Sequence, residues 1–555
     1  MAPIFWQRTS TRLAAALSTV LLLAAATGCT SAAPASGPVA PTGPKVNRLL
    51  LAMPAPAREG SSPNMELDPL TIFQVRPMLE WLIGYTPDGK FYPMLATEWS
   101  VEPDGKSMRF KLRKGIPFHN GAGDFNAQDV AYSFEQITRP DAIHPHSPTQ
   151  RKVKVDVIND LEVVFRLTTP NAEYLNMLSE QSGGMAITSK ADAAILGTDA
   201  SSKTRPLAST GPYQFTAREQ GRSMTFARVP YQHYRATPDF PELQMTWIGE
   251  ASTRLASLLT GEIHITQLPQ DLTPQATDKG MKLLRGPISA QRTWLNFQGM
   301  YLKDSNDMSK GYVHSDVAFA DVRVRKAMNK AIDREALNKA FFANKAEMMY
   351  IDKMPRKSVY FNPAWETNFK QEYGYDPAAA QALLTEAGYG PGKPLKFKVR
   401  LQNLPDYGGS EDLEEAVAGY WRKVGIEPEL ANIQETEYRN INDQLGWKDL
   451  ITVSASSNFD IQGWRVYNSS IPPRSALELR ETDPIIQELL QTMDEKKQND
   501  LLRKVGDVAY PLHMNIPLFW LPAELIINPT IVEAWPYPGS ISRIFSHFET
   551  IKAAK

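Results

Sequence analysis

Apolar and polar residues alternate in the first third of the chain with the period of β-strands. Residues 108–112 read Met-Arg-Phe-Lys-Leu, so every second side chain is apolar, as in a strand with one buried face. A Pro-Asp-Gly triplet at 103–105 precedes this run and supplies turn residues. A second alternating run at 153–157 turns at 159–160 into the apolar run 161–167. We therefore expect a β-rich region built of hairpins, with one helix.

The later part of the chain is predicted to alternate helices with strands. Apolar residues follow a helical period in three segments with their own start or stop signals, at 376–388, 413–425 and 483–490. Short strands are predicted between these helices at 395–399 and 450–453. Such alternation is typical of a layered α/β domain.

Residues 115–134 look at first like an active-site loop, because His119 stands close to Asp124 and Asp129. A structural interpretation accounts for them equally well. His119 ends the preceding strand in a turn, Asn126 caps the following helix, and Asp129 lies in its first turn, where a negative charge is favourable. The inward face of this helix is expected to carry Val130, Phe134 and Ile137.

Residues 1–28 are predicted to be a secretory signal, because two arginines precede an apolar run at 13–26. The only cysteine of the chain, Cys29, follows directly in Ala-Thr-Gly-Cys, which resembles the lipobox of bacterial lipoproteins. We expect Cys29 to be lipidated; the alternative is an ordinary signal peptide followed by an unmodified thiol. Residues 29–46 are rich in Pro, Ala and Ser, which predicts a flexible tether.

Composition and charge narrow the function further. The net charge of −1 provides no basic stripe of the kind that nucleic-acid binding usually needs, so no nucleic-acid partner is expected. Because the single cysteine stands at the end of the signal, the mature body is predicted to contain no disulfide. No later segment reaches the roughly 20 apolar residues of a membrane-spanning helix. The body of roughly 510 residues is expected to form two or three domains.

Local enzyme and cofactor motifs are absent from the sequence. Residues 388–394 lack the first glycine and the hydroxyl residue of a phosphate loop, and 121–126 lack the third glycine of a dinucleotide fingerprint. No Gly-x-Ser-x-Gly, His-Glu-x-x-His or Cys-x-x-Cys occurs. His144 and His146 have no nearby acid, so we expect a solvated loop there. We therefore predict no catalytic residues, no metal and no cofactor.

A set of short phrases spread over most of the mature chain carries a family resemblance. The phrases stand at 67–69, 80–83, 86–90, 93–99, 118–121, 209–213, 251–254, 261–263, 319–327, 375–389 and 516–518. Their order and spacing resemble the family 5 extracellular solute-binding proteins, the peptide, nickel and opine receptors of ABC importers. The resemblance implies an α/β periplasmic-binding-protein type II fold, in which two lobes close on a cleft and an extra β-rich domain is present.

The same resemblance implies three domains that the chain enters more than once. Domain I would hold residues 47–75, 207–285 and 510–555. Domain II would be inserted at 76–206 and domain III at 286–509. The β-rich first third of the chain fits domain II, and the alternation of helices and strands fits domain III.

The resemblance further implies an extracytoplasmic lipoprotein that captures a peptide or a similar-sized solute and delivers it to an ABC permease. We expect a monomer, held by its lipid anchor at the outer face of the cytoplasmic membrane, on the periplasmic side where an outer membrane exists. Closing on a ligand requires no covalent step, so the protein is not expected to be an enzyme. Two alternatives remain open: an exported hydrolase on the same fold, and a ligand sensor or chaperone-like protein.

The family places its ligand in the cleft between domains I and III, which directs the choice of candidate residues. The candidate ligand-binding residues are Met65, Glu66, Trp294, Asn296, Asn458, Asp460, Trp464, Arg465 and Tyr467. Trp294 and Asn296 would share one face of a strand, although Trp294 could equally pack in the core. Asp460 lies near the place where peptide-binding members have an acid for the amino terminus, and it could equally be a surface acid. Arg465 could pair with a ligand carboxylate.

Overall fold

A computed structural model of the protein describes most of the chain from residue 44 to residue 555. The described residues are 44–555 without 57–58, 68–71, 87–89, 145, 182, 197–204, 287–290, 402–409, 457–460, 470–476 and 537–545. The expected signal segment and Cys29 lie outside the described residues. Within the described part, no helix combines the length and the apolar character that crossing a bilayer requires.

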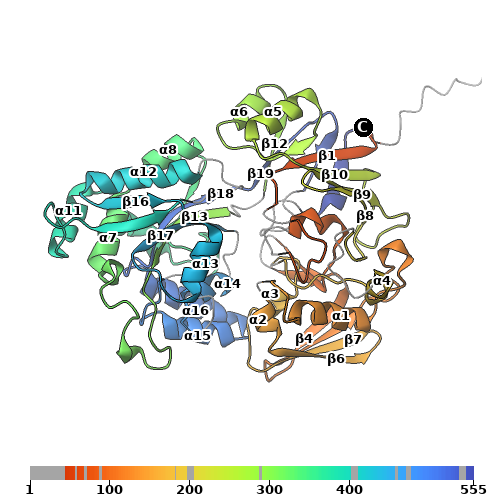
Figure 1. The fold of residues 1–555 in the computed structure, drawn as a ribbon, viewed down its shortest axis with the longest axis horizontal. Helices are drawn as coiled ribbons and strands as arrows, with labels where there is room; N and C mark the ends of the chain where they lie inside the picture. The colour runs from red at the N-terminus through yellow and green to blue at the C-terminus, as the bar shows by residue number, and fades with distance from the viewer. Residues whose placement is uncertain are drawn as a thin grey trace, which may run out of the picture. The chain divides into compact units, whose positions relative to one another are not determined.

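One sheet of seven strands is built from segments far apart in the chain (Figure 1). Its strands lie in the order β12 (Lys282–Arg285), β19 (Glu524–Ile527), β11 (Ile265–Thr266), β1 (Arg48–Met53), β10 (Glu242–Trp247), β9 (Ser223–Arg228) and β8 (Tyr213–Glu219). Strand β1 is parallel to both of its neighbours, β10 and β11, and the other pairs are antiparallel. The nearly continuous apolar run of β1 fits a strand buried on both faces. Helices α5 (Ala251–Thr260) and α6 (Thr273–Thr277) accompany this sheet.

A second sheet has six strands and most of the helices. Its strands lie in the order β14 (Glu347–Met348), β18 (Asn515–Leu521), β13 (Gln291–Gln298), β17 (Leu450–Ser456), β15 (Lys396–Arg400) and β16 (Glu427–Ala431). The helices of this region are α7 (Val322–Lys330), α8 (Arg334–Phe342), α9 (Pro363–Thr367), α10 (Phe369–Tyr373), α11 (Pro377–Glu386), α12 (Ser410–Lys423), α13 (Glu435–Asp443), α14 (Ile461–Trp464), α15 (Asp483–Gln491) and α16 (Glu495–Ala509). The predicted alternation of helices and strands is confirmed here, with α11, α12, α15, β15 and β17 at the predicted positions.

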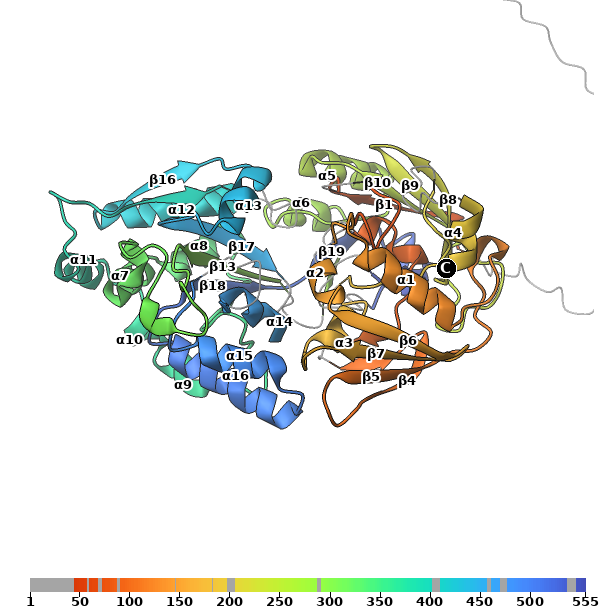
Figure 2. The same cartoon turned by 60° about the horizontal axis from the view of Figure 1, so that its bottom comes forward.

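The β-rich first third is also confirmed. Four strands pair in the order β4 (Ala96–Val101), β5 (Ser107–Leu112), β7 (Glu162–Leu167) and β6 (Val153–Asn159), and all pairs are antiparallel. The smaller elements of this region are β2 (Ile83–Tyr85), β3 (Phe91–Pro93), α2 (Ser147–Gln150), α3 (Tyr174–Met177) and α4 (Lys190–Leu196). Near the end of the chain, β20 (Val532–Ala534) pairs with β21 (Lys552–Ala553). Helix α1 (Ala127–Thr138) lies beside the four-stranded sheet (Figure 2). Phe134 of this helix contacts Phe165 of β7 edge to face, with 6.0 Å between ring centres.

The segment 115–134 has the structural role that the sequence predicted. The Asn126 side chain accepts a hydrogen bond from the Gln128 backbone, and the Asp129 carboxylate accepts one from the Asn126 backbone, which together form a capping box. His119 is buried, and its Nε2 bonds with the Gly211 carbonyl oxygen at 2.8 Å. Burial lowers the pKa of His119 to about 4, so the ring is neutral at physiological pH. The inward residues Val130, Phe134 and Ile137 are buried as expected.

The expectation of a solvated loop at His144 and His146 is wrong. Both side chains are buried, with 2% and 4% of their surface exposed. The Nε2 atom of His144 bonds with the Gly183 carbonyl oxygen at 3.2 Å, and its Nδ1 accepts from the His146 backbone N–H. The two rings lie 5.2 Å apart. The pair therefore helps to pack the region around α2, which residue spacing alone does not reveal.

Two chain segments each contribute one strand to both sheets. Strands β12 and β19 are antiparallel in the seven-stranded sheet, and their continuations β13 and β18 are antiparallel in the six-stranded sheet. Gly286 N–H donates to the Ala523 carbonyl at 2.9 Å on one side of the passage, and Gln291 lies opposite Leu521 on the other. We call the described residues of these two segments, 282–286 with 291–298 and 515–527, the crossing ribbon. The domain ranges given above remain a prediction; β18 pairs in the six-stranded sheet and β19, after Pro522, pairs in the seven-stranded sheet.

A further contact joins the four-stranded region to the helices α15 and α16. Ala172 N–H donates to the Leu490 carbonyl oxygen at 3.0 Å. Met493, between these helices, packs against the core of the four-stranded sheet, and its Cγ would lie 3.2 Å from a Cβ atom on Gly105. The two parts of the fold are therefore in contact away from the crossing ribbon as well.

Substitution by alanine is expected to have opposite effects on stability at Gly211 and at Gly419. A Cβ atom on Gly211 would lie 2.5 Å from the Met78 backbone carbon, whereas one on Gly419, inside α12, would meet no atom within 4 Å. We expect Gly211→Ala to destabilise the protein by about 1–3 kcal/mol through overpacking. Gly419→Ala should stabilise it by about 1 kcal/mol, because alanine is the better helix former. Urea unfolding of both variants measures this, and equal shifts would contradict it.

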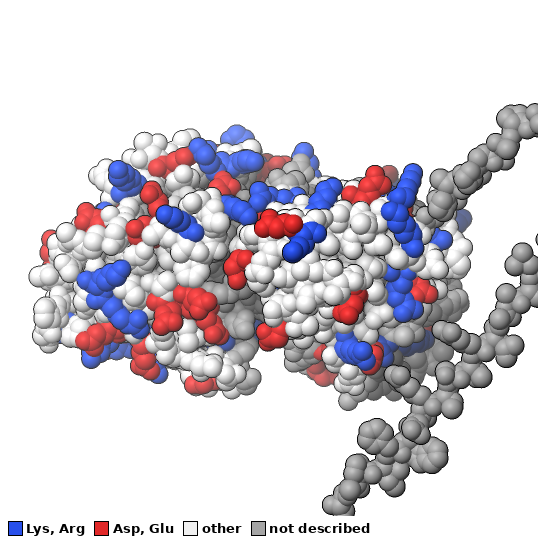
Figure 3. Space-filling model, turned by 90° about the horizontal axis from the view of Figure 1, so that it is seen from above, with Lys and Arg blue, Asp and Glu red and all other residues white. Residues whose placement is uncertain are grey.

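Charges of both signs are interspersed on the surface. On the face seen in Figure 3, Lys and Arg side chains alternate with Asp and Glu, and neither sign forms a continuous stripe. This distribution agrees with the balanced composition of 60 basic and 61 acidic residues.

Candidate ligand-binding site

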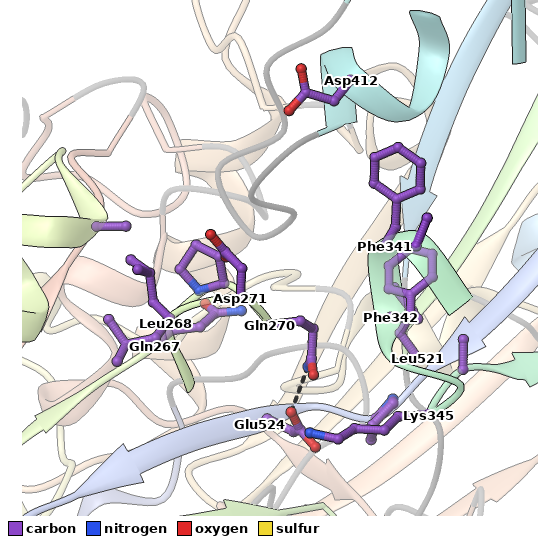
Figure 4. A pocket seen from close by; sticks show the side chains of 16 residues that line it. Gln267, Leu268, Gln270, Asp271, Phe341, Phe342, Lys345, Asp412, Leu521 and Glu524 are labelled. Atoms are coloured by element: carbon purple, nitrogen blue, oxygen red, sulfur yellow. Dashed lines mark hydrogen bonds between the residues drawn. The ribbon is translucent and has the colours of Figure 1, made fainter. Parts of the chain in front are cut away.

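A pocket of about 420 Å³ lies beside the crossing ribbon (Figure 4). Its lining comes from both parts of the fold. One side is the segment 267–272, between β11 and α6, and the other is the end of α8 at 340–346 with Asp412 of α12. Leu521, Pro522 and Glu524 of the ribbon complete the lining. The volume is within the range of small-molecule sites.

The pocket has an apolar wall on the α8 side. Phe342 is buried and packs against Phe519 of β18 with 5.3 Å between ring centres, while Phe341 is half-buried. Leu521 of the ribbon and Leu268 on the opposite side are also buried, with 9% and 6% of their surface exposed. Apolar walls of this kind are typical of small-molecule sites, where a few polar groups then fix the orientation of the ligand.

The polar groups of the pocket are mostly acceptors. Glu524 is buried and accepts hydrogen bonds from Gln270 Nε2 and Arg285 Nε, each at 2.6 Å. Asp271 and Asp412 are exposed and form no hydrogen bond or ion pair with any residue that the structure describes. Lys345 is the one lysine of the lining, and its side chain extends toward Glu524 (Figure 4).

A buried cluster of charged side chains joins Arg292, on strand β13 of the crossing ribbon, to Asp352 and Lys353. The carboxylate of Asp352 forms ion pairs with the Arg292 guanidinium and with the Lys353 ammonium, the latter at 2.7 Å. All three side chains are at most 2% exposed. Arg292 also lies over the Trp294 ring, 4.0 Å from its centre, and Lys353 lies 4.8 Å from the Tyr467 ring centre.

Hydrogen bonds extend this cluster through neutral groups. Tyr467 O–H lies 2.9 Å from Asp352 Oδ2 and 3.0 Å from Asn296 Oδ1, and it accepts from Asn515 Nδ2 at 3.0 Å. Trp294 Nε1 donates to the same Asn296 oxygen at 2.8 Å. The network therefore ties β13 and β18 to the segment around Asp352 and to the 3-10 turn that contains Tyr467.

Ionisation in this cluster follows from burial and charge. Burial and the neighbouring Arg292 lower the pKa of Lys353 to about 7, against the opposing effect of Asp352. Burial disfavours the charged form of Asp352, but Arg292 and Lys353 outweigh it and lower the pKa of this carboxyl. The cluster thus holds one carboxylate between two basic groups, of which Lys353 titrates near neutral pH.

The structure brings three of the candidate residues together. Trp294, Asn296 and Tyr467 belong to the charged cluster, and Trp464 packs against Tyr467 with 5.8 Å between ring centres. Arg465, next along the chain, is half-buried and forms no side-chain hydrogen bond with a described residue.

The other candidates lie elsewhere or outside the described residues. Met65 packs with Ala193 and Leu207, and Glu66 accepts a hydrogen bond from the Ser61 backbone at 3.2 Å. Asn458 and Asp460 lie outside the described residues. None of the described candidates lines the 420 Å³ pocket. A ligand-binding role for all nine residues stays a prediction.

Several residues of this region were not expected from the sequence. Asp352 and Lys353 stand side by side in the apolar run Met-Met-Tyr-Ile-Asp-Lys-Met, and adjacent charges in such a run could have indicated a buried ion pair. Asp271, Phe341 and Asp412 had no comparable signal, because the pocket is assembled from segments far apart in the chain.

A second charged cluster lies between β2, β3 and the C-terminal region. Glu180 pairs with Arg76 at 3.3 Å and with His547 at 3.4 Å, and His547 also contacts Glu549 at 3.3 Å. The cavity among these groups measures about 10 Å³, which is enough for a single water and too small for a solute. We interpret this cluster as structural. Among the described residues, no group of three or more metal-ligating side chains is found.

We expect the protein to lose stability in mild alkali, because His547 then loses its proton. Burial opposes its charge, but Glu180 and Glu549 outweigh burial and raise the pKa of His547 to about 9. The stabilisation is complete below the unfolded pKa near 6.5 and is lost as the pH rises through 9. Between pH 6 and pH 9 we expect a loss of about 2–3 kcal/mol that His547→Asn does not show. Denaturant unfolding at both pH values measures the difference, and parallel pH profiles would contradict the assignment.

Comparison with known proteins gives consistent results. The family model described as "Bacterial extracellular solute-binding proteins, family 5 Middle" matches residues 90–483. The dipeptide-binding protein of Escherichia coli (strain K12) is 25% identical over 389 residues, which cover 65% of this chain and 66% of that protein. Heme-binding protein A of Haemophilus influenzae is 26% identical over 371 residues, which cover 62% and 63%. The chain thus matches just under two thirds of the length of these relatives.

Solved structures resemble the whole described fold. DppA from Helicobacter pylori, a periplasmic binding protein in complex with the peptide STSA, superposes with a TM-score of 0.72 at 18% identity over 92% of this chain and 98% of its own. NikA from Brucella suis in complex with Fe(III)-EDTA gives a TM-score of 0.72 at 20% identity over 91% and 99%. This likeness confirms the predicted fold class, an α/β fold of the type II periplasmic-binding-protein kind.

Proposed function

Because the chain belongs to the bacterial extracellular solute-binding proteins of family 5, we propose that it captures a peptide or a similar-sized solute and delivers it to an ABC permease. The observation that carries the proposal is the family match over residues 90–483, which includes most of both regions that line the pocket. The relatives are binding proteins, so a non-catalytic role fits the family.

The geometry supports capture between two parts that move against each other. The pocket draws its lining from both sheets, and they are joined by the crossing ribbon. A solute that contacts both sides gains affinity only when the sides come together, so it shifts the protein toward a closed form. The proposed domains are the ranges 47–75, 207–285 and 510–555, with 76–206 and 286–509 inserted, and the proposed protein is a monomer.

A binding experiment tests the capture of peptides. The chain from residue 30 is purified, stripped of bound solute by unfolding and refolding, and titrated with di- and tripeptides in a calorimeter. We expect saturable binding of at least one peptide, which mass spectrometry then recovers intact. Recovery of cleaved peptide would favour the alternative of an exported hydrolase, and failure of every peptide to bind would contradict peptide capture.

A lipid anchor at Cys29 is the proposed means of holding the protein at the membrane. When the full chain is expressed in a bacterium with lipoprotein processing, we expect it to enter the detergent phase on phase separation, because acyl chains add about 0.8 kcal/mol of membrane affinity per buried CH₂. Cys29→Ser should move the protein to the aqueous phase. Equal partitioning of the two forms would show that Cys29 is not lipidated.

A further inference from the structure

The end of helix α15 is completed by a residue from the four-stranded region. The last carbonyl oxygens of a helix have no hydrogen-bond donor within the helix itself. At the end of α15, the Leu489 oxygen accepts from Thr492 N–H at 3.2 Å, within the same segment. The Leu490 oxygen instead accepts at 3.0 Å from Ala172 N–H, which lies between β7 and α3. A hydrogen bond between distant parts of the chain therefore satisfies this helix end.

A methionine beside this helix end extends the contact with an apolar side chain. Met493, between α15 and α16, is half-buried and packs against the core of the four-stranded sheet. Gly105, in the turn between β4 and β5, is buried and has φ +65°, which glycine adopts without strain. A Cβ atom there would lie 3.2 Å from Met493 Cγ and 3.5 Å from Pro170 Cβ. The missing side chain of Gly105 therefore leaves room for the methionine.

The two sides of this contact belong to different sheets. Met94, next to β4, packs in the core of the seven-stranded sheet, together with Leu51 of β1. Leu489 of α15 packs in the core of the six-stranded sheet, together with Leu295 of β13. Because the crossing ribbon joins these sheets at another place, a rotation about the ribbon would carry the two sides of the contact apart.

We propose that this contact is a latch that determines how much of the protein is closed before a solute binds. The latch consists of Met493 seated against Gly105 and of the hydrogen bond from Ala172 to Leu490. The inference rests on the closing motion of the proposed function, and it holds for whichever solute is captured. It gives the four-stranded region a part in closure, although that region contributes no residue to the lining of the 420 Å³ pocket.

The chemistry of the latch makes it reversible. When it opens, water replaces the partners of Ala172 N–H and of the Leu490 oxygen, so this hydrogen bond fixes the geometry and adds little net stability. Most of the stabilisation comes from the apolar surface of Met493, which returns to water on opening. A solute that binds the closed form most tightly has an apparent affinity that scales with the closed fraction. Met493 would thus adjust the affinity without touching the solute.

A distance between two spin labels tests the latch without any solute. The full chain with Cys29→Ser has no other cysteine, so Lys154→Cys on β6 and Lys496→Cys on α16 place one label on each side. Both lysine side chains are at least 80% exposed. After the chain is stripped of solute, pulsed electron double resonance should show one narrow distance. Met493→Ala should raise the fraction at longer distances about fivefold, as the loss of a half-buried apolar side chain provides.

Matched variants show whether the methionine contact is the cause. Met493→Leu keeps an apolar side chain of similar volume and should keep the short distance. Met308→Ala makes the same truncation in a turn without buried residues, Met308–Lys310, and should leave the distance unchanged. Urea unfolding verifies that each variant folds. If Met493→Ala does not fold, Met493→Gln replaces it and should lengthen the distance in the same way.

The outcomes separate the latch from solute capture. A short distance that persists in the alanine or glutamine variant would overturn the latch, and so would a broad distribution in the unsubstituted protein. Either result leaves capture intact if a peptide binds. A longer distance in Met493→Ala alone among these truncations would support the latch, even if every peptide fails to bind and peptide capture is wrong.

Discussion

Asp352→Asn is expected to lower the free energy of unfolding by about 3–5 kcal/mol, the usual cost of breaking a buried ion pair from one side. Asp352 is the carboxylate that faces both Arg292 and Lys353, and each of these side chains is at most 2% exposed. Asparagine keeps the size of the side chain but leaves the buried Arg292 guanidinium without a counter-charge and removes the group that favours the charged form of Lys353. Urea unfolding at pH 7, followed by tryptophan fluorescence, measures the loss.

The pH dependence of this variant identifies the cause. Without Asp352, the pKa of Lys353 falls further, so the unfolded state binds more protons than the folded state above that pKa. The variant should therefore recover stability, relative to the wild type, as the pH rises through this lowered pKa toward 7, and above about pH 8 the two profiles should run parallel. Asp500→Asn removes an exposed partner of Lys496 on α16 and should leave the unfolding midpoint unchanged. A similar small shift for both variants would contradict the charged state of the cluster.

Glu80→Gln is expected to cost about 3 kcal/mol, because Glu80 is a fully buried acceptor for several donors. Its carboxylate accepts from Tyr234 O–H at 2.6 Å, from Thr210 Oγ1 at 2.8 Å and from Arg235 Nε at 2.8 Å. Arg235 retains its second partner, Glu549, which limits the loss. Thermal and urea unfolding at pH 7 measure the effect.

Acid should remove the difference between this variant and the wild type. Burial disfavours the charge of Glu80, but Arg235 and the hydrogen bonds of His233 and Tyr234 outweigh burial and lower its pKa. The stabilisation is present above the unfolded value of 4.5 and is lost as the pH falls through the lower folded pKa. Glu242→Gln, which removes the exposed partner of Arg48, is the control and should have little effect at any pH. A constant difference down to pH 3 would exclude an ionised Glu80.

The local elements could be predicted from the sequence because their signals are local. The alternation at 108–112 predicted β5, and Asn126 was predicted to cap the helix that the structure shows as α1. The phrases from 67 to 518 further supported a family, and the family match over 90–483 and the structural likeness confirm it. For these features, each residue's neighbours in the chain are also its neighbours in space.

The site was harder to predict because it depends on pairing over long distances in the chain. Arg292 and Asp352 are 60 residues apart, and β13 and β18 pair over more than two hundred. No periodicity reports such contacts. Strand alternation predicted that Trp294 and Asn296 share one face of a strand. The contact of Tyr467 with Asn296 was not predicted, because it joins segments 171 residues apart. The lining of the pocket gave no local signal at all.

The crossing ribbon contains a position that can bend without loss of a ladder hydrogen bond. Pro522 lies between Leu521, which is opposite Gln291 in the six-stranded sheet, and Ala523, whose carbonyl oxygen accepts from Gly286 N–H. Proline has no N–H, so bending there breaks no ladder hydrogen bond on its own strand. The ribbon therefore permits the two sheets to rotate about it, while the paired strands on either side of Pro522 resist separation of the sheets. When the sheets rotate, a residue moves in proportion to its distance from the ribbon. The hydrogen bond from Ala172 N–H to the Leu490 carbonyl oxygen, away from the ribbon, should therefore report the first degrees of opening.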